Sequence, residues 1–247
     1  GLALEGLKPV VALYSTFLQR SYDQILHDVC LQDLRVIFAI DRAGIVGDDG
    51  DTHQGIFDIA FLRNMPNMVL CAPADAYELE KMLAFGLSQK HPFAMRYARD
   101  AAVMEKISGK DRIAAGKGSV LIDGNDAAIF CLGDMVNPSL KAAEGLRKEG
   151  ISCAVINARF ANPIDAKLVK DYADKTGHII TVEDGILAGG FGSAVSELFD
   201  CVDVKAKIKR LGLSSKPMPH GKRKFLLEKC GLTASGIAAG ARSCLST

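Results

Sequence analysis

The chain has 247 residues, of which 49% are hydrophobic and 24% are charged, and its formal net charge is +1. This composition is typical of a globular protein with one large domain or two ordinary ones, and it excludes a disordered chain. A charge so close to zero gives no electrostatic reason to expect nucleic acid or an acidic membrane as a partner.

The cysteines and the apolar runs bear on the cellular compartment. The seven cysteines include no C-x-x-C pair, and an odd number without a disulfide framework favours a reducing environment. No secretory signal is visible, and no apolar run reaches the roughly 18 residues that a membrane span needs. We therefore expect a cytoplasmic protein, or one from the plastid stroma if the source is eukaryotic.

The first six residues resemble the last turn of a helix that ends at a glycine cap, Gly6. We therefore expect the chain to begin inside a domain.

The first hundred residues alternate between short apolar strands and helical segments. Strands are expected at 10–13, 36–40, 68–72 and 93–97, and helices at 17–31 with Ser15 or Thr16 as cap, at 57–62, and from Pro73 to about Gly86. The strands are apolar throughout, which indicates a parallel sheet covered on both faces. We predict a first domain over residues 1–100 and, because a broken polar pattern follows, a linker over 101–117.

A second α/β unit is expected over residues 118–247. Its strands are predicted at 119–122, 127–132, 153–157, 178–182 and 204–211, and its helices at 137–148, 165–175, 191–199, 222–230 and 234–241. The Asp-Gly-Asn-Asp turn at 123–126 predicts a β-hairpin between the first two strands. The predicted fold class is thus α/β, with two successive doubly wound domains built on mainly parallel sheets.

A polar loop, residues 41–55, follows the strand at 36–40 and holds four glycines, Arg42 and His53. Locally this is either a solvated turn or the chemical site of an α/β enzyme, since such sites lie at strand ends. His53 is the natural acid or base there, and we assign the other four histidines to structural or surface positions. The aspartates at 48, 49 and 51 lack EF-hand spacing, so we expect no metal cage.

Two further segments end predicted strands. Arg96 and Arg99 end the strand at 93–97, and with Arg42 they suit a phosphate or carboxylate. Tyr14 and Phe17 begin a helix after the first strand, where their rings can face a flat ligand, although the segment by itself favours a helix cap with a core phenylalanine.

The glycine run at 189–192 imitates a dinucleotide-binding fingerprint without its G-x-G-x-x-G spacing. Lys209 and Arg210 occupy the region where the acidic partner would lie. We therefore exclude an NAD site and expect a tight strand-to-helix turn.

Several longer stretches are specific when they are taken together. They are residues 14–20 (YSTFLQR), 22–24, 27–29, 41–47 (DRAGIVG), 49–50, 52–55 (THQG), 183–185, 189–195 and 219–221. In this combination the whole chain resembles the 1-deoxy-D-xylulose-5-phosphate synthase family, which belongs to the transketolase-like thiamine diphosphate enzymes. The resemblance covers most of a pyrimidine-binding domain and a C-terminal domain.

The resemblance implies the condensation of pyruvate with D-glyceraldehyde 3-phosphate, which releases CO₂ and supplies a precursor of isoprenoids, thiamine and pyridoxal. By matching position, Tyr14, Arg42 and Arg99 resemble substrate-binding residues. His53 and Asp49 resemble catalytic residues of the substrate channel, with proton transfer assigned to His53. The resemblance further implies a homodimer.

The cofactor assignments rest on the same resemblance. Phe17 resembles the aromatic residue that packs on the aminopyrimidine of thiamine diphosphate, and Arg20 in the same stretch is assigned to the cofactor as well. The Mg²⁺ and diphosphate motif of the family, G-D-G…N, is absent, and Glu5 is not in the context of the family's activating glutamate. We therefore expect the metal and diphosphate ligands outside this chain, in an N-terminal diphosphate-binding domain, and we expect the chain alone to be inactive.

Two departures leave the proposed side chains in place. Ala98 replaces a usual proline, and residues 216–218 differ from the usual approach to Pro219. The alternatives that remain are another thiamine diphosphate enzyme, such as a transketolase or a 2-oxoacid dehydrogenase β-type subunit, and a non-catalytic scaffold of the same fold.

Overall fold

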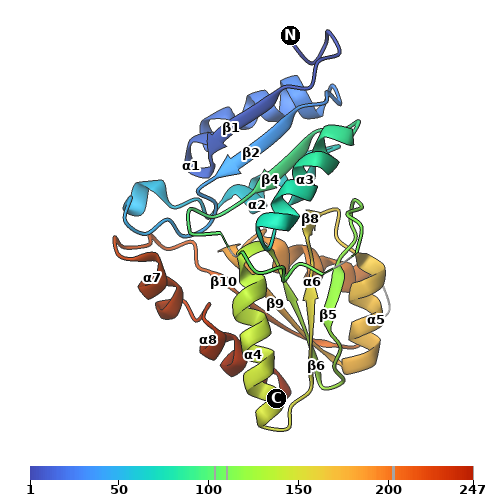
Figure 1. Ribbon diagram of the computed structural model, residues 1–247, viewed down its shortest axis with the longest axis vertical. Helices are drawn as coiled ribbons and strands as arrows, with labels where there is room; N and C mark the ends of the chain where they lie inside the picture. The colour runs from blue at the N-terminus through green and yellow to red at the C-terminus, as the bar shows by residue number, and fades with distance from the viewer. Residues whose placement is uncertain (103, 110, 202–203, 247) are drawn as a thin grey trace.

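Two five-stranded sheets lie one above the other in the computed structural model, which describes residues 1–102, 104–109, 111–201 and 204–246 (Figure 1). The first sheet has the order β1-β2-β4-β3-β8 and is parallel except for its last strand. Its strands are β1 (Val10–Tyr14), β2 (Ile37–Asp41), β3 (Val69–Cys71), β4 (Phe93–Arg96) and β8 (Phe160–Asn162). Together with the second sheet, which is also mainly parallel, it confirms the predicted α/β fold class.

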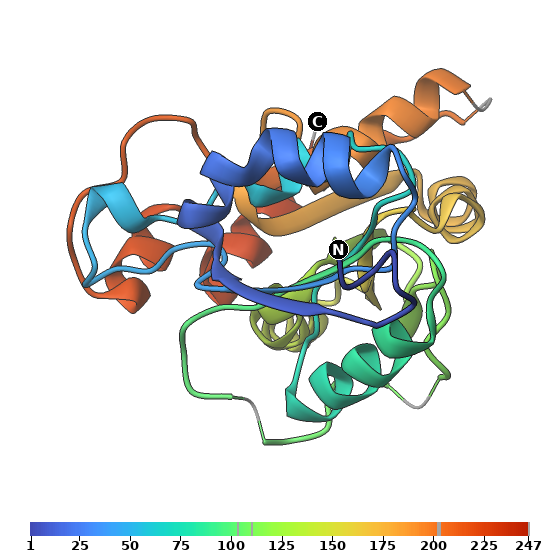
Figure 2. The ribbon, with the colours of Figure 1, turned by 90° about the horizontal axis from the view of Figure 1, so that it is seen from above.

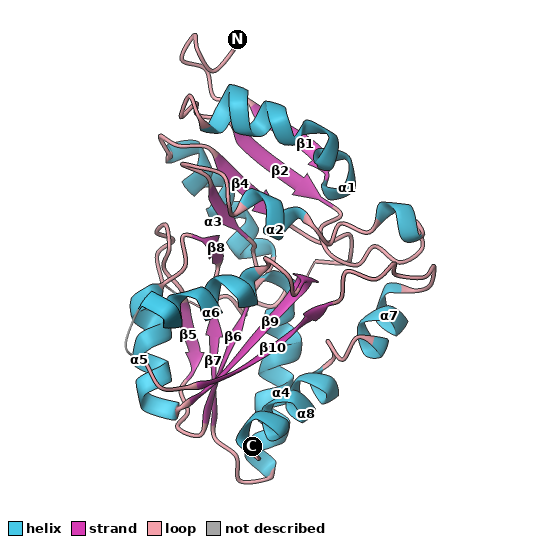
Figure 3. Ribbon diagram, turned by 180° about the vertical axis from the view of Figure 1, so that it is seen from behind, coloured by secondary structure: helices cyan, strands magenta, loops and turns pink. Residues whose placement is uncertain are grey.

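The second sheet has the order β10-β9-β6-β7-β5, again with one antiparallel edge strand. Its strands are β5 (Ser119–Ile122), β6 (Ala127–Cys131), β7 (Cys153–Asn157), β9 (His178–Ile186) and β10 (Lys207–Leu213). Helices α4 (Val136–Lys148) and α8 (Ala234–Leu245) cover one face, and α5 (Ala166–Thr176) and α6 (Phe191–Cys201) cover the other (Figure 3). The helix α7 (Arg223–Lys229) precedes α8, and the short turn η4 (Gly133–Met135) precedes α4.

The predicted hairpin between β5 and β6 is wrong. Both edges of β6 are taken by parallel neighbours, β7 and β9, and β5 pairs antiparallel with β7 instead. The turn passes the start of β7, where the amides of Asn125 and Asp126 both donate to the carbonyl of Ser152, at 3.0 and 2.9 Å. Gly124 permits this crossing, because a Cβ there would lie 2.3 Å from the nitrogen of Ala154.

The segment after β1 is less regular than the single helix predicted from its apolar spacing. It consists of α1 (Ser15–Leu18), a 3₁₀ turn η1 (Gln19–Ser21) and a π-helical segment η2 (Gln24–Cys30). The predicted capping by Ser15 or Thr16 is also wrong, because the cap position is Tyr14 and no side chain bonds there. The Thr16 hydroxyl donates instead to the carbonyl of Thr52, at 3.0 Å, and so contacts the polar loop.

Two helices cover the first sheet beyond this segment. They are α2 (Asp58–Leu62), after the short turn η3 (Asp51–His53), and α3 (Ala76–Ser88). Buried residues of β2, β3 and β4 pack against α3 on one face, and on the other face they pack with α2, η2 and the α5–α6 side of the second sheet. The apolar residues on this second face form one continuous core that spans the two units.

The strand β8 was missed by the sequence analysis, although it closes the first sheet. It pairs antiparallel with β3, and Asn162 Nδ2 donates to the carbonyl of Met68 at 2.7 Å. The chain of the second unit therefore supplies the edge strand of the first, which ties the two units together.

The described part of the predicted linker contains no helix or strand; Val103 and Lys110 lie outside the described residues. It is held to the first unit by Asp75, whose Oδ2 accepts from the amides of Ile107 and Ser108 at 2.9 and 2.7 Å. Within the described ranges no helix is both long enough and apolar enough to cross a membrane.

Candidate active site

The carboxyl ends of β1, β2 and β4 meet at one edge of the first sheet, because the three strands run parallel. Tyr14 ends β1 directly opposite Asp41, which ends β2. The loop 41–55 continues from β2, and Arg99 follows β4 by three residues. The structure thus brings three of the predicted polar segments to one place.

The loop 41–55 is closed on itself by hydrogen bonds. Gly44 and Gly55 form a two-way bridge, with N···O distances of 2.7 and 2.9 Å. The buried side chain of Gln54 accepts from the amide of Val46 at 2.8 Å and donates to the carbonyl of Gly50 at 3.1 Å. These bonds satisfy backbone groups that a solvated turn would leave to water. They therefore favour a structured site over a solvated turn.

Asp49 lies between the two arginines assigned to substrate binding. Its Oδ1 accepts from Arg99 Nη1 at 2.5 Å, and its Oδ2 lies 3.6 Å from Arg42 Nε. The hydrogen bond from Arg99 holds the pKa of Asp49 below its ordinary value. One ionised carboxylate therefore serves two guanidinium groups, an arrangement that an incoming oxyanion can replace.

Arg42 is held from several sides. Its guanidinium carbon lies 3.7 Å from the centre of the Tyr14 ring, a cation–π contact, and it pairs with Asp41. Its backbone has φ +55°, a left-handed conformation that the Asp41 carboxylate supports by accepting from the Arg42 amide at 2.6 Å. Its Nε is buried, makes no hydrogen bond within the described residues and has the Asp49 carboxylate 3.6 Å away.

The aromatic side chains and His53 form the other half of the cluster. The rings of Tyr14 and Phe17 are stacked with centroids 5.1 Å apart, and His53 meets Phe17 edge-on at 5.5 Å. Thr52 Oγ1 lies 2.9 Å from His53 Nδ1. Phe17 remains 48% exposed, so one face of this aromatic group is available to a flat heterocycle.

The predicted site residues are brought together with one exception. Tyr14, Phe17, Arg42, Asp49, His53 and Arg99 form the cluster described above. Arg20, in η1, is exposed and takes part in none of the contacts that the described residues of this cluster make. Across the described ranges, no group of three or more His, Cys, Asp or Glu side chains is placed to hold a metal ion.

Arg96 does not join Arg99 at the ligand edge, because it is 2% exposed and points into the protein. Its Nε donates to Asp58 Oδ2 at 2.9 Å and its Nη1 to Asp184 Oδ1 at 2.5 Å. Asp184 comes from β9 of the second unit and lies beneath the loop, where a Cβ on Gly44 would be 1.8 Å from its Oδ2. This buried ion cluster, which the sequence analysis missed, supports the loop from below.

A segment of the second unit also contacts the loop from outside. In Figures 1 and 2 the chain that leads into α7 runs beside the loop 41–55. His220 Nε2 donates to the carbonyl of Asp48 at 3.1 Å, and Arg223 Nε donates to the carbonyl of Ile45 at 2.9 Å. The sequence signal for His220 was its Pro-His-Gly motif, whereas Arg223 had none.

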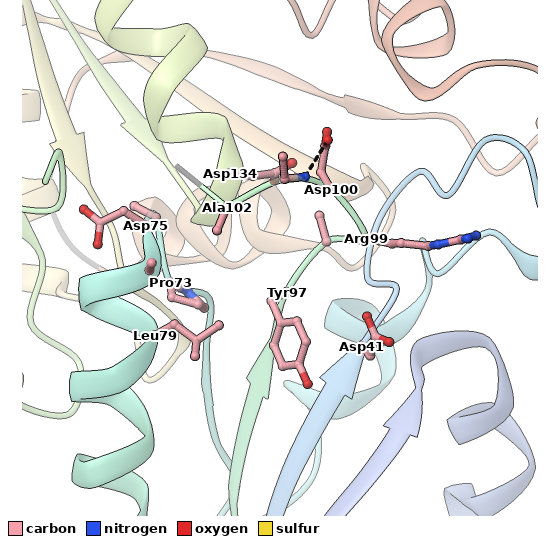
Figure 4. A pocket seen from close by; sticks show the side chains of 13 residues that line it. Asp41, Pro73, Asp75, Leu79, Tyr97, Arg99, Asp100, Ala102 and Asp134 are labelled. Atoms are coloured by element: carbon pink, nitrogen blue, oxygen red, sulfur yellow. Dashed lines mark hydrogen bonds between the residues drawn. The ribbon is translucent and has the colours of Figure 1, made fainter. Parts of the chain in front are cut away.

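A pocket of about 370 Å³ adjoins the cluster. Its lining includes Asp41 at the end of β2, Tyr97 directly after β4, and Asp134 of the second unit. Figure 4 shows Arg99 at its rim with the guanidinium turned away from the pocket, toward the loop. The arginine pair therefore faces the loop side of this edge.

Glu183, buried near the site, should make the free energy of unfolding depend on pH. Burial raises its pKa to about 7, although its carboxylate accepts from the amides of Phe191 and Gly192, both at 2.8 Å. Because an unfolded glutamate titrates near 4.5, the native state keeps a proton that the unfolded state loses between these values. The free energy of unfolding should therefore fall as pH rises from about 4.5 to 7 and level off above.

Urea titrations across this pH range should show that Glu183→Gln flattens the decline. Glu197→Gln is the control, because the hydrogen bond from Arg63 lowers the Glu197 pKa and its contribution is lost only at lower pH. An unchanged slope in Glu183→Gln would contradict the assignment.

The fold and the site together define a two-domain α/β protein with charged and aromatic side chains gathered at the carboxyl edge of its first sheet. Residues 1–103 match the transketolase pyrimidine-binding domain, and residues 116–237 match the transketolase C-terminal domain. The chain belongs to the transketolase family.

Within this family the sequence is similar to 1-deoxy-D-xylulose-5-phosphate synthases, which confirms the resemblance stated from the sequence. It is 50% identical over 242 residues to the synthase of Heliobacterium modesticaldum, covering 98% of this chain and 37% of the relative. It is 48% identical over 245 residues to that of Aquifex aeolicus, covering 99% and 39%. The chain thus spans about two fifths of the length of these curated relatives.

A solved structure is similar over the whole chain. It is described as a split gene transketolase, an inactive β4 tetramer, and it matches with a TM-score of 0.92 and 32% identity, covering 100% of this chain and 79% of the other.

Proposed function

We propose that this chain is the pyrimidine-side and C-terminal part of an enzyme that condenses pyruvate with D-glyceraldehyde 3-phosphate, giving 1-deoxy-D-xylulose 5-phosphate and CO₂. The observation that carries the proposal is the pair of guanidinium groups, Arg42 and Arg99, that share the carboxylate of Asp49. The names of the relatives that are about half identical to the chain support the same reaction.

In this proposal the two arginines bind the phosphate of the triose. Guanidinium groups form short, charge-assisted bonds to phosphate oxygens, and Asp49 pairs with both cations until the phosphate arrives. Tyr14 holds the Arg42 guanidinium under its ring and so fixes its direction. Binding then exchanges one oxyanion for another, which limits the desolvation cost.

Phe17 and Tyr14 are the residues that fit the cofactor. An exposed ring with a stacked neighbour suits an aminopyrimidine, and Phe17 is placed so at the sheet edge. When bound, thiamine diphosphate supplies a carbon nucleophile and an electron sink for the decarboxylation. Arg20 stays a proposed cofactor contact that would require the diphosphate to reach η1.

His53 is the proposed proton carrier. Thr52 Oγ1 lies at hydrogen-bond distance from its Nδ1, so Nε2 is the nitrogen left to face the reacting groups. An imidazole at this distance from Phe17 lies beside the plane where the pyrimidine would stack. The proposed role is to move a proton to or from the oxygen of the acceptor aldehyde.

The proposal includes partners for this chain. A diphosphate-binding segment with its Mg²⁺ ligands completes the site, and the chain is inactive without it. Two findings support this need: the chain spans about two fifths of its relatives, and the similar split gene transketolase is an inactive β4 tetramer. A homodimer is proposed as well, with support from the exposed aromatic residues Tyr22 and Phe57, which line one hollow of about 620 Å³. A cytoplasmic location stays a prediction.

The test measures CO₂ and the ketose phosphate formed by the assembled enzyme with thiamine diphosphate and Mg²⁺. Pyruvate alone, the triose phosphate alone and the two together are compared, with and without the diphosphate-binding segment. Product only from the complete mixture supports the proposal. Two-carbon transfer between sugar phosphates without pyruvate would indicate a transketolase, and robust activity of the chain alone would refute the need for a second segment.

A further inference from the structure

Arg223, at the start of α7, connects three separate parts of the chain. Its Nε donates to the carbonyl of Ile45 at 2.9 Å, its Nη1 donates to Asp100 Oδ2 at 2.9 Å, and its Nη2 bonds to Asp134. Its side chain is only 14% exposed. Every nitrogen of the guanidinium is therefore engaged with a different partner.

Two of these partners adjoin the arginine pair of the site. Ile45 lies in the loop between Arg42 and Asp49, and Asp100 directly follows Arg99. The third partner, Asp134 in η4, belongs to the second unit and follows β6. Arg223 therefore fixes both phosphate-binding segments against a common point on the second sheet.

The loop has little other freedom at this contact. A Cβ on Gly47 would lie 2.7 Å from the backbone nitrogen of Arg223 and 2.7 Å from the carbonyl oxygen of Gly221, so the backbones of the two segments are in close contact. Gly47 has φ +80°, which a glycine adopts without strain. The fit of the loop against residues 221–223 is thus one of shape as well as hydrogen bonding.

In the part of the chain that the structure describes, the bond between Arg99 and Asp49 also joins these two segments, beside the backbone contact of Ala43 with Tyr97. It joins a half-exposed arginine to the carboxylate that a phosphate would replace. When a phosphate takes this place, the link through Asp49 is lost, while the three contacts of Arg223, which do not involve Asp49, remain.

We propose that Arg223 is a positioning residue that sets the spacing of Arg42 and Arg99 for the phosphate of the acceptor substrate. The proposal rests on the function proposed above and deepens it. Arg223 itself does not touch the ligand. A lysine cannot replace it, because an ammonium group lacks the planar fork that reaches three partners at once.

The test compares two acceptors in the assembled enzyme, D-glyceraldehyde 3-phosphate and unphosphorylated D-glyceraldehyde. For Arg223→Gln and Arg223→Lys, the ratio of kcat/KM for the phosphorylated to the unphosphorylated acceptor should fall about 10- to 100-fold, mainly through KM, as misplaced binding groups do. Lys222→Gln is the matched control, since it removes the same charge one residue earlier from an exposed side chain, and its ratio should stay that of the wild type.

Two readouts do not depend on turnover. Titration calorimetry with inorganic phosphate should give a Kd about 10-fold weaker in both Arg223 variants, in proportion to the lost alignment. Amide hydrogen exchange should rise at residues 44–50 and stay unchanged in β6.

The outcomes separate this proposal from the proposed function. If the wild type condenses neither acceptor, the function is wrong, and the phosphate titration and hydrogen exchange still decide the role of Arg223. An equal loss with both acceptors, or unchanged phosphate affinity in Arg223→Gln, would show a merely structural residue and overturn the proposal. Arg223→Lys, which keeps the charge, covers the case in which Arg223→Gln fails to fold.

Discussion

Arg96→Met should lower the free energy of unfolding by about 3–5 kcal/mol, the cost of leaving a buried charge without its partner. Arg96 is 2% exposed, and its partners Asp58 and Asp184 are 0% and 1% exposed. Burial raises the pKa of Asp58, and the guanidinium is what opposes that shift. Without Arg96 the two carboxyl groups must either protonate or remain charged in the core, and urea titration measures the loss.

Two companion variants define the cause. Arg96→Met combined with Asp58→Asn and Asp184→Asn should recover much of the loss, because replacing a whole buried ion cluster is far less costly than breaking it. Arg242→Met removes a forked bond to Glu149 on the surface and should leave the midpoint nearly unchanged. If Arg96→Met unfolds at the wild-type midpoint, the ion cluster does not hold the two units together.

Local signals predicted most of the elements correctly because neighbouring residues carry them. Asp75 and Asp165 are N-caps in the structure, where their side chains accept from the amides of Glu78 and Leu168. The strand Cys153–Asn157 has its predicted bounds. Each of these features depends on an apolar run or a cap within a few residues, which the sequence displays directly.

The errors in the fold come from pairing at a distance. The turn at 123–126 has the composition of a hairpin, yet its strands are separated by β7, since sheet order depends on which edges other strands have already filled. The three residues of β8 are too few for a periodic signal, and they join a strand about ninety positions earlier. Local propensity contains neither fact.

The site shows the same division. Arg42 and Arg99 were predicted together because the carboxyl ends of parallel strands share one edge, and the family resemblance added Tyr14 to them. The sharing of Asp49 between two arginines depends on how the loop folds back, and the pairing of Arg96 joins residues 38 and 88 positions apart. Arg223 reaches the loop from 178 positions away. Such contacts follow from the packing of the second unit on the first.

Arg42→Gln should lower kcat/KM for D-glyceraldehyde 3-phosphate by about 30- to 1,000-fold, or roughly 2–4 kcal/mol of transition-state stabilisation. Arg42 is the more buried of the pair, with its side chain 18% exposed against 48% for Arg99, and its guanidinium carbon lies 3.7 Å from the Tyr14 ring centre. The glutamine amide keeps part of the shape and loses the charge, so Asp49 is then opposed by Arg99 alone. Steady-state kinetics of the assembled enzyme provide the measurement.

Arg35→Gln is the matched control, because Arg35 precedes the same strand that Arg42 follows, and it bonds only to the carbonyl of Gln89 in the contacts described. Its kinetics should equal those of the wild type. With unphosphorylated D-glyceraldehyde, Arg42→Gln should lose far less, since no phosphate is there to bind. A loss of the same size with both acceptors would mean that Arg42 shapes the loop instead of binding the phosphate. Arg99 would then be the one arginine of the pair that binds it.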